Sequence, residues 1–162
     1  MENILNILDQ DTLGYILPLF IALFFGMIMG MERVYAHKTA GMRTYALVSM
    51  GSALFVLVSG EMVKAYAGFD GLNPLHIVAQ IIVGVGFIGT GLIFTKDNRL
   101  MGLTTATGLW VSAGIGMACG FGLYKLAAVA TVFTLFIFIV LWFIEQQLKK
   151  TKLFAQSNTD DH

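Results

Sequence analysis

The sequence has few charged residues. Charged side chains make up 12% of the 162 residues, about half of the roughly 25% that is typical of soluble domains. Ten basic and ten acidic residues leave a formal net charge of zero. A nucleic-acid-binding surface needs an excess of positive charge to engage phosphates, so this balance argues against nucleic acid as a partner.

Cysteine is almost absent as well. The single thiol, Cys119, allows neither an internal disulfide nor a metal cluster built from cysteines. What the sequence does contain is apolar, since hydrophobic residues reach 57%. A soluble domain of this size could not bury that much apolar surface because its surface-to-volume ratio is too high, and a disordered chain would contain far less of it. The composition therefore predicts an integral membrane protein with a single domain.

Five intervals without Asp, Glu, Lys or Arg are near the length of a membrane-spanning helix, which needs about 20 mainly apolar residues. Because lipid offers no partner for an unpaired backbone group, such segments are expected to be helical. We therefore predict an all-α bundle of five transmembrane helices. Residues 1–11 contain no Lys or Arg, which a cleaved signal peptide would need, so the first helix should be retained. The intervals cover residues 12–31, 44–60, 71–95, 100–124 and 126–144.

The basic residues are distributed unevenly between the two sides that five spans would create. The side richer in Lys and Arg is the cytoplasmic one, so we expect the N-terminus outside and the C-terminus in the cytoplasm. Residues 1–148 would form the transmembrane domain and residues 149–162 a short cytoplasmic tail. Only Lys64 and Lys125 fall on the outer side, whereas the cytoplasmic side has Arg33, Lys38, Arg43, Lys96, Arg99, Lys149, Lys150 and Lys152.

Small residues recur at steps of four, which places them on one face of a helix. Such faces let helices approach closely in lipid, so we expect them to pack the bundle. The segment VGVGFIGTG is also rich in glycine, and its Gly89 and Gly91 would either pack tightly or interrupt the third helix near the cytoplasm. It does not match a dinucleotide-binding loop. The packing candidates are Gly26 and Gly30 in the first span and Gly108, Ser112, Gly116 and Gly120 in the fourth.

Two charges at the cytoplasmic side oppose the helix dipole, which favours cations at C-termini and anions at N-termini. Glu32 ends the first span and Arg43 begins the second. Neighbouring helical residues do not face each other, so Glu32 is predicted to pair with Arg43 and not with Arg33. The alternative is two independent, solvated charges.

The remaining candidate residues have structural roles as alternatives to functional ones. Gln80 lies deeper than any charge and forms either a structural interhelical bond or part of a ligand site. Thr105 can bond to its own helix, and Trp110 is by default a packing or lipid contact. No Asp or Glu lies deep in a span, and no nucleophile, general base or metal-ligand set is evident. We expect no enzymatic activity, no cofactor and no metal site.

Three segments resemble the signatures of the MgtC/SapB family of bacterial membrane proteins. They occur in the family's order and read GMERVYAHKTAGMRTYALVSMGSALFVLVSG, NPLHIVAQIIVGVGFIGTGLIF and MGLTTATGLWVSAGIGMACGFG. The positions that match the family pattern are Glu32, Arg33, Ala40, Gly41, Arg43, Thr44, Pro74, Gln80, Gly84, Gly86, Gly89, Gly91, Gly102, Leu103, Thr105 and Trp110.

The resemblance implies a five-helix domain of the bacterial inner membrane, associated with growth or virulence under low magnesium. It implies a regulatory or adaptor role through contacts with other membrane proteins, including the proton-translocating ATP synthase, or with a second copy of the chain. The alternative is a small transporter or channel for Mg²⁺ or another ion. We expect the functional centre to combine Glu32, Arg43, Gln80 and the Gly89–Gly91 segment. Further candidate functional or binding residues are Arg33, Thr44, Thr105 and Trp110.

Overall fold

A computed structural model of the protein describes residues 10–66, 74–96 and 98–157, which are mostly helical. A π-helical turn joins the last two helices, and a short β-hairpin joins α4 to α5. The prediction of an all-α bundle is confirmed apart from this hairpin. The elements are α2 (Gln10–Tyr35), α3 (Met42–Ala65), α4 (Pro74–Thr90), β1 (Phe94–Lys96), β2 (Arg99–Met101), α5 (Leu103–Gly120), α6 (Tyr124–Phe136), η1 (Ile137–Leu141) and α7 (Trp142–Ser157).

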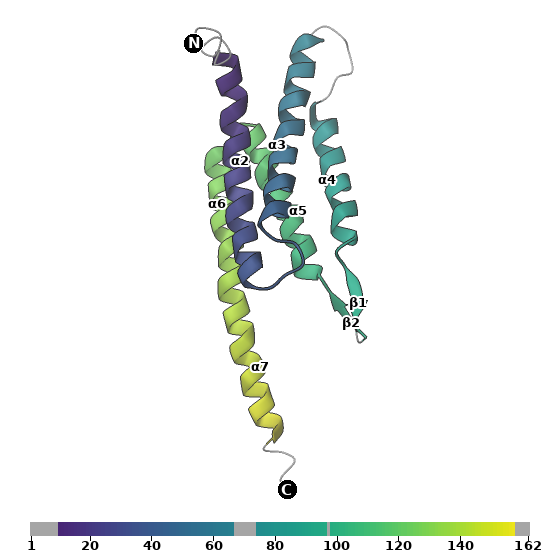
Figure 1. The fold of residues 1–162 in the computed structure, drawn as a ribbon, viewed down its shortest axis with the longest axis vertical. Coiled ribbons are helices and arrows are strands. Elements are labelled where there is room, and N and C mark those ends of the chain that lie inside the picture. The colour runs from purple at the N-terminus through teal and green to yellow at the C-terminus, as the bar shows by residue number, and fades with distance from the viewer. Residues whose placement is uncertain (1–9, 67–73, 97, 158–162) are drawn as a thin grey trace.

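The helices form a bundle with α2, α3 and α5 in mutual contact at its centre (Figure 1). Helix α4 packs against α3 and α5, and α6 packs against α5 and α2. Successive helical columns run in opposite directions, so that α2 begins at one end and α7 finishes at the other (Figure 1). The turn between α2 and α3, the hairpin and the first turn of α5 lie toward the end at which α7 emerges, which we call the lower end.

Many small residues are buried in the interior beside a few large ones such as Met29 and Leu109, while most large apolar side chains cover the outside. Ser49, Ala53 and Ser112 are buried, whereas Phe20 and Phe133 are exposed. Soluble proteins rarely expose contiguous apolar surface on this scale, and helices in lipid associate through small residues. The distribution is that of a membrane protein.

Three helices in the described part of the chain are long and apolar enough to cross a membrane. They cover Thr12–Tyr35, Met42–Ala65 and Tyr124–Leu148, and Leu75–Thr90 is a shorter apolar helix. Helices α4 and α5 have 17 and 18 residues, which at 1.5 Å per residue is about 26 Å. This is slightly less than the roughly 30 Å of a hydrocarbon core. The five-span count therefore stays a prediction.

The connection between α4 and α5 differs from the sequence prediction, which extended helix to residue 95 and began the next span at residue 100. The chain leaves the helix after Thr90 and forms the antiparallel β1–β2 hairpin, with Phe94 opposite Met101. Gly102 ends the hairpin with φ of +87°, and a Cβ at this position would overlap the Leu92 carbonyl. Only glycine suits this position, because side chains disfavour positive φ.

The last helical column is longer than predicted. We expected the fifth span to end near residue 144, whereas α7 continues to Ser157. In η1, backbone bonding widens by one residue, and this single π turn leaves the column continuous (Figure 1). Most of the predicted tail is thus helical, and residues 158–162 lie outside the described residues.

Candidate functional site

A cluster of buried polar side chains joins the central helices in the lower half of the bundle. It combines groups from α2, α3 and α5 with one ring from η1. Most of its members are almost completely shielded, although such residues are costly to bury unless they find partners. We call it the polar cluster, and its members are Glu32, Arg33, Tyr45, Ser49, Thr105, Ser112 and Phe138.

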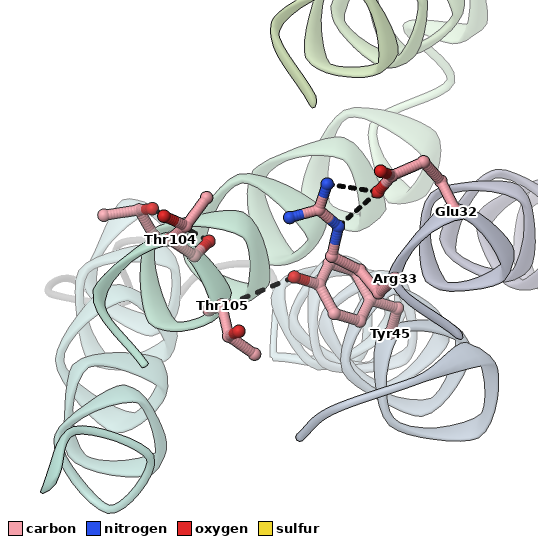
Figure 2. Close-up of polar contacts among 6 residues, drawn as sticks. Glu32, Arg33, Tyr45, Thr104 and Thr105 are labelled. Atoms are coloured by element: carbon pink, nitrogen blue, oxygen red, sulfur yellow. Dashed lines mark hydrogen bonds and ion pairs between the residues drawn. The ribbon is translucent and has the colours of Figure 1, made fainter. Parts of the chain in front are cut away.

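Arg33 is the buried cation of this cluster and is only 2% exposed. Its Nε and Nη2 both contact the Glu32 carboxylate, as Figure 2 shows. Its guanidinium carbon lies 3.5 Å from the centroid of the Phe138 ring, in a cation–π contact. The ion pair and the ring together compensate for removing the guanidinium from water, and they tie the end of α2 to η1.

The predicted pair between Glu32 and Arg43 is wrong. Glu32 binds its neighbour Arg33, and Arg43 is exposed on the first turn of α3. The prediction failed because it treated the pair as an interaction between regular helix faces. Glu32 and Arg33 both lie near the end of α2, and their long side chains bend toward each other so that the carboxylate reaches the buried guanidinium (Figure 2).

Tyr45 links α3 to the start of α5. Its phenol donates a hydrogen bond to the Thr105 carbonyl over 3.2 Å (Figure 2), and its own carbonyl accepts one from the Ser112 hydroxyl at 3.0 Å. The adjacent Ser49 hydroxyl is buried without a partner. Gly108 makes room for this arrangement, because a Cβ there would overlap the Tyr45 hydroxyl and lie 2.7 Å from Phe138 Cζ.

At and around the polar cluster the central helices are in very close contact at four glycines. A Cβ on Gly26 would lie 2.5 Å from the Tyr45 carbonyl, and one on Gly116 would overlap the Ser49 carbonyl. A Cβ on Gly30 would likewise meet the Met42 backbone, and one on Gly120 would meet the Val56 side chain and the Ala53 carbonyl. The interface among α2, α3 and α5 therefore has no room for a single additional methyl group at these points.

The flank between α3 and α4 is open by contrast. A groove of about 530 Å³ runs between these helices, and we call it the α3–α4 groove. Its lining includes Leu47, Gly51 and Phe55 from α3 and Gln80, Gly84 and Ile88 from α4. A Cβ on Gly51 or Gly84 would meet nothing within 4 Å. The Gln80 amide is exposed in this mostly apolar setting.

A model of the MgtC family matches residues 19–147, which is most of the chain. The chain belongs to the MgtC family. This confirms the resemblance inferred from the three sequence segments.

Individual relatives of this MgtC-family chain support the assignment. The chain is 43% identical over 128 residues to "Putative magnesium transporter YhiD" of Escherichia coli K12, which covers 78% of this chain and 60% of that protein. It is 44% identical over 116 residues to "Protein MgtC" of Brucella abortus, covering 69% and 44%. It is 39% identical over 142 residues to "Protein MgtC" of Salmonella typhimurium, covering 88% and 58%.

The chain thus spans about half the length of these curated MgtC-family relatives. No solved structure matches the chain.

The other predicted site residues of this MgtC-family chain do not assemble into one centre. Gln80 belongs to the α3–α4 groove and Arg43 to the lower surface. Gly89 packs against Ala106 of α5, with 3.6 Å from a built Cβ to the Ala106 side chain, and Gly91 is exposed where α4 has ended. The third helix therefore ends at the Gly89–Gly91 segment.

The remaining candidates lie on two sides of α5 and at the start of α3. Thr105 is in the polar cluster, but it contributes its backbone carbonyl. Trp110 is 53% exposed and lines a separate cavity of about 310 Å³ between α4, α5 and α6. Thr44 is half-buried in the first turn of α3.

Sequence reasoning missed Tyr45, Ser49 and Phe138. Tyr45 lies within the first matching segment and next to the candidate Thr44, so its position in a polar run was an available signal. Phe138 lies in a uniformly apolar stretch, and nothing in the sequence distinguishes it from its neighbours. Among the residues that the structure describes, no group of three or more His, Cys, Asp or Glu side chains lies together.

Proposed function

We propose that this protein is a regulatory or adaptor protein of the bacterial inner membrane, which acts during magnesium limitation by binding another membrane protein through its helices. In this proposal α4 and α5 cross the membrane together with the three longer helices. The N-terminus is outside and the C-terminus is in the cytoplasm. No enzymatic step is part of the proposal.

The observation that carries this proposal is the contrast between a closed centre and an open flank. The α2–α3–α5 interface is closed by direct backbone contact at Gly26 and Gly116. Its polar groups bind one another, as Arg33 binds Glu32. An ion path along this interface would need space that the glycine contacts occupy. The open apolar volume lies instead on the outer flank, where a neighbouring helix can reach it.

Gln80 indicates what occupies the α3–α4 groove. An amide exposed to hydrocarbon has unsatisfied donors and acceptors, and helices in lipid use such groups to bond to one another. Gly51 and Gly84 leave space for close approach beside it. We therefore assign the groove to a transmembrane helix of a partner protein that presents a polar side chain to Gln80. The proton-translocating ATP synthase is the first partner to test, and a second copy of the chain is the competing outcome.

The competing function is ion transport. It is favoured by the name of the Escherichia coli relative, which describes that protein as a putative magnesium transporter. The two functions differ in one measurement, because a transporter moves its ion without a partner. Purified protein in liposomes should show no Mg²⁺ flux above protein-free vesicles if the adaptor proposal is correct. Flux that depends on the protein would refute it.

Partner binding has its own test in cells. A photo-crosslinking residue at Gln80 should capture a membrane protein during growth in low magnesium, whereas the same residue at Val132, on the exposed face of α6, should not. Capture of the chain by itself would replace the adaptor model with a homo-oligomer. Equal capture from both positions would refute the groove as the binding surface.

The topology is tested separately by labelling single cysteines in a Cys119→Ala background. Asn98 lies in the hairpin at the lower end, and the exposed Leu123 lies in the turn between α5 and α6 at the other end. Cysteines at these positions should be labelled from the cytoplasm and from outside, respectively. Labelling of both from one side would contradict five spans.

A further inference from the structure

A polar cavity lies at the lower end of the bundle, apart from the apolar α3–α4 groove. It has a volume of about 340 Å³ and is bounded by the end of α2, the start of α5, η1 and the start of α7. This size falls at the small end of the range for ligand sites, about 300–1,000 Å³. We call it the lower cavity, and the lining residues that matter below are Arg33, Lys38, Thr104, Leu141, Trp142 and Glu145.

Arg33 lines this cavity with hydrogen-bonding capacity that the protein does not use. A guanidinium has five N–H donors, and Glu32 accepts from Nε and Nη2 only. Among the described residues, no hydrogen bond or ion pair reaches Nη1, which points away from Glu32 in Figure 2. Arg33 is only 2% exposed overall, so the lower cavity is the route by which an acceptor can reach this donor.

The neighbouring groups suit a phosphate as the acceptor. Lys38 supplies a second cation, and the exposed Thr104 supplies a hydroxyl. Guanidinium and ammonium groups recognise phosphate oxygens through charge-assisted hydrogen bonds. Glu145 places a carboxylate in the same lining. A ligand that carries both a phosphate and an ammonium group would therefore match the lining better than a purely anionic one.

The apolar part of the lining distinguishes a lipid from a soluble phosphate. Leu141 and Trp142 line the cavity and are about half exposed, which suits contact with the glycerol and upper acyl region. Tryptophan is enriched at the membrane–water interface, at the level of the lipid headgroups. We propose that the lower cavity binds the headgroup of a zwitterionic aminophospholipid such as phosphatidylethanolamine, with its phosphate on Arg33 and Lys38 and its ammonium toward Glu145. This requires only that the bundle lies in a bilayer, so it holds for an adaptor or a transporter.

Native mass spectrometry of the purified protein released from mixed-lipid nanodiscs tests the proposal. The nanodiscs would contain equal amounts of phosphatidylethanolamine, phosphatidylcholine and phosphatidylglycerol. We expect one retained phosphatidylethanolamine, preferred by about tenfold over its trimethylated counterpart phosphatidylcholine, which has no N–H to donate to Glu145. Equal retention of all three lipids, or preference for phosphatidylglycerol, would overturn the proposal.

Variants separate the cavity from the general charge of the lower end. Lys38→Ala should reduce retention of phosphatidylethanolamine, and Glu145→Gln should remove its preference over phosphatidylcholine. Lys96→Ala is the matched control, because Lys96 is an exposed lysine of the same end outside the lower cavity. An equal loss with Lys96→Ala would refute a specific site. Displacement of the lipid by millimolar free phosphoethanolamine would refute the lipid as the ligand and identify a soluble phosphate site.

Discussion

Helix α3 takes part in two interfaces that are built from the same residue types but have opposite character. Toward α2 and α5 it presents the Tyr45 backbone to Gly26 and the Ser49 backbone to Gly116. Toward α4 it presents Gly51 to a groove that its own chain leaves open. Glycine in a membrane helix thus marks a close approach without saying whether the approaching helix belongs to the same chain. The two interfaces also predict opposite responses to mutation.

The largest effect is expected where the first interface is filled. Gly116→Leu should lower the free energy of unfolding by about 3 kcal/mol or prevent assembly, because its side chain would collide with the Ser49 backbone. Gly84→Leu adds the same side chain to the α3–α4 groove, where nothing lies within 4 Å. Thermal unfolding in detergent should show little change for this control. If Gly116→Leu retained wild-type stability, the closed interface would not exist in the membrane protein.

A somewhat smaller effect is expected when the polar cluster is broken without overfilling the interface. Arg33→Ala should cost about 2 kcal/mol, less than the roughly 3–5 kcal/mol of a fully buried ion pair, because the Glu32 that it leaves without a partner is partly exposed. The exposed Arg43→Ala should change stability by less than about 0.5 kcal/mol.

A double-mutant cycle compares the two candidate partners of Glu32 directly. The cycle of Glu32→Gln with Arg33→Ala should show coupling of more than about 0.5 kcal/mol. The cycle of Glu32→Gln with Arg43→Ala should be additive, since the structure pairs Glu32 with Arg33. Coupling in the second cycle would restore the ion pair that the sequence suggested.

Removing a single hydrogen bond should cause a smaller loss of stability. Tyr45→Phe removes the bond to the Thr105 carbonyl while keeping the ring, and should cost about 1 kcal/mol. Tyr35→Phe is the control, because Tyr35 is exposed at the end of α2. Chemical denaturation in detergent would measure both variants. Equal values for the two would mean that the phenol contributes nothing to the α3–α5 contact.

The smallest change in stability should accompany a large change in function. Gln80→Leu should alter the unfolding free energy of the isolated protein by less than about 0.5 kcal/mol, because the amide is exposed in the α3–α4 groove. The same change should abolish growth support in low magnesium, in a host that depends on this protein. The control is Val83→Leu on the outer face of α4. Unimpaired growth with Gln80→Leu would contradict a role for the groove.

The helical architecture was predictable because its signals are local and repeated. Charge-free intervals locate the helices, and the four-residue steps that include Gly26 and Gly116 mark small faces before any contact is known. These signals are the apolar composition that lipid requires and the spacing of residues along a helix, and both can be read from the sequence without knowledge of tertiary contacts.

The candidate site was less predictable because it depends on where helices end and how they cross. The end of α4 at Thr90 moves Gly91 out of the bundle, and the end of α2 lets Glu32 bend toward Arg33. Phe138 reaches Arg33 from more than one hundred positions along the chain. No periodic pattern encodes such a contact. The need for glycine at position 108 is visible only once the positions of Tyr45 and Phe138 are known.

The π turn fixes how the side chains of α7 are rotated about the helix axis relative to those of α6. The buried stripe of α6 passes through Ala127, Thr131 and Thr134 and finishes at Phe138 inside η1. Deleting one residue of η1 would turn everything beyond it by about 100° relative to α6. The wall of the lower cavity formed by Trp142 and Glu145 would then face elsewhere. Shortening α7 from its C-terminal end would therefore leave the orientation of Trp142 and Glu145 unchanged, whereas deleting a single residue of η1 would rotate both away from the lower cavity.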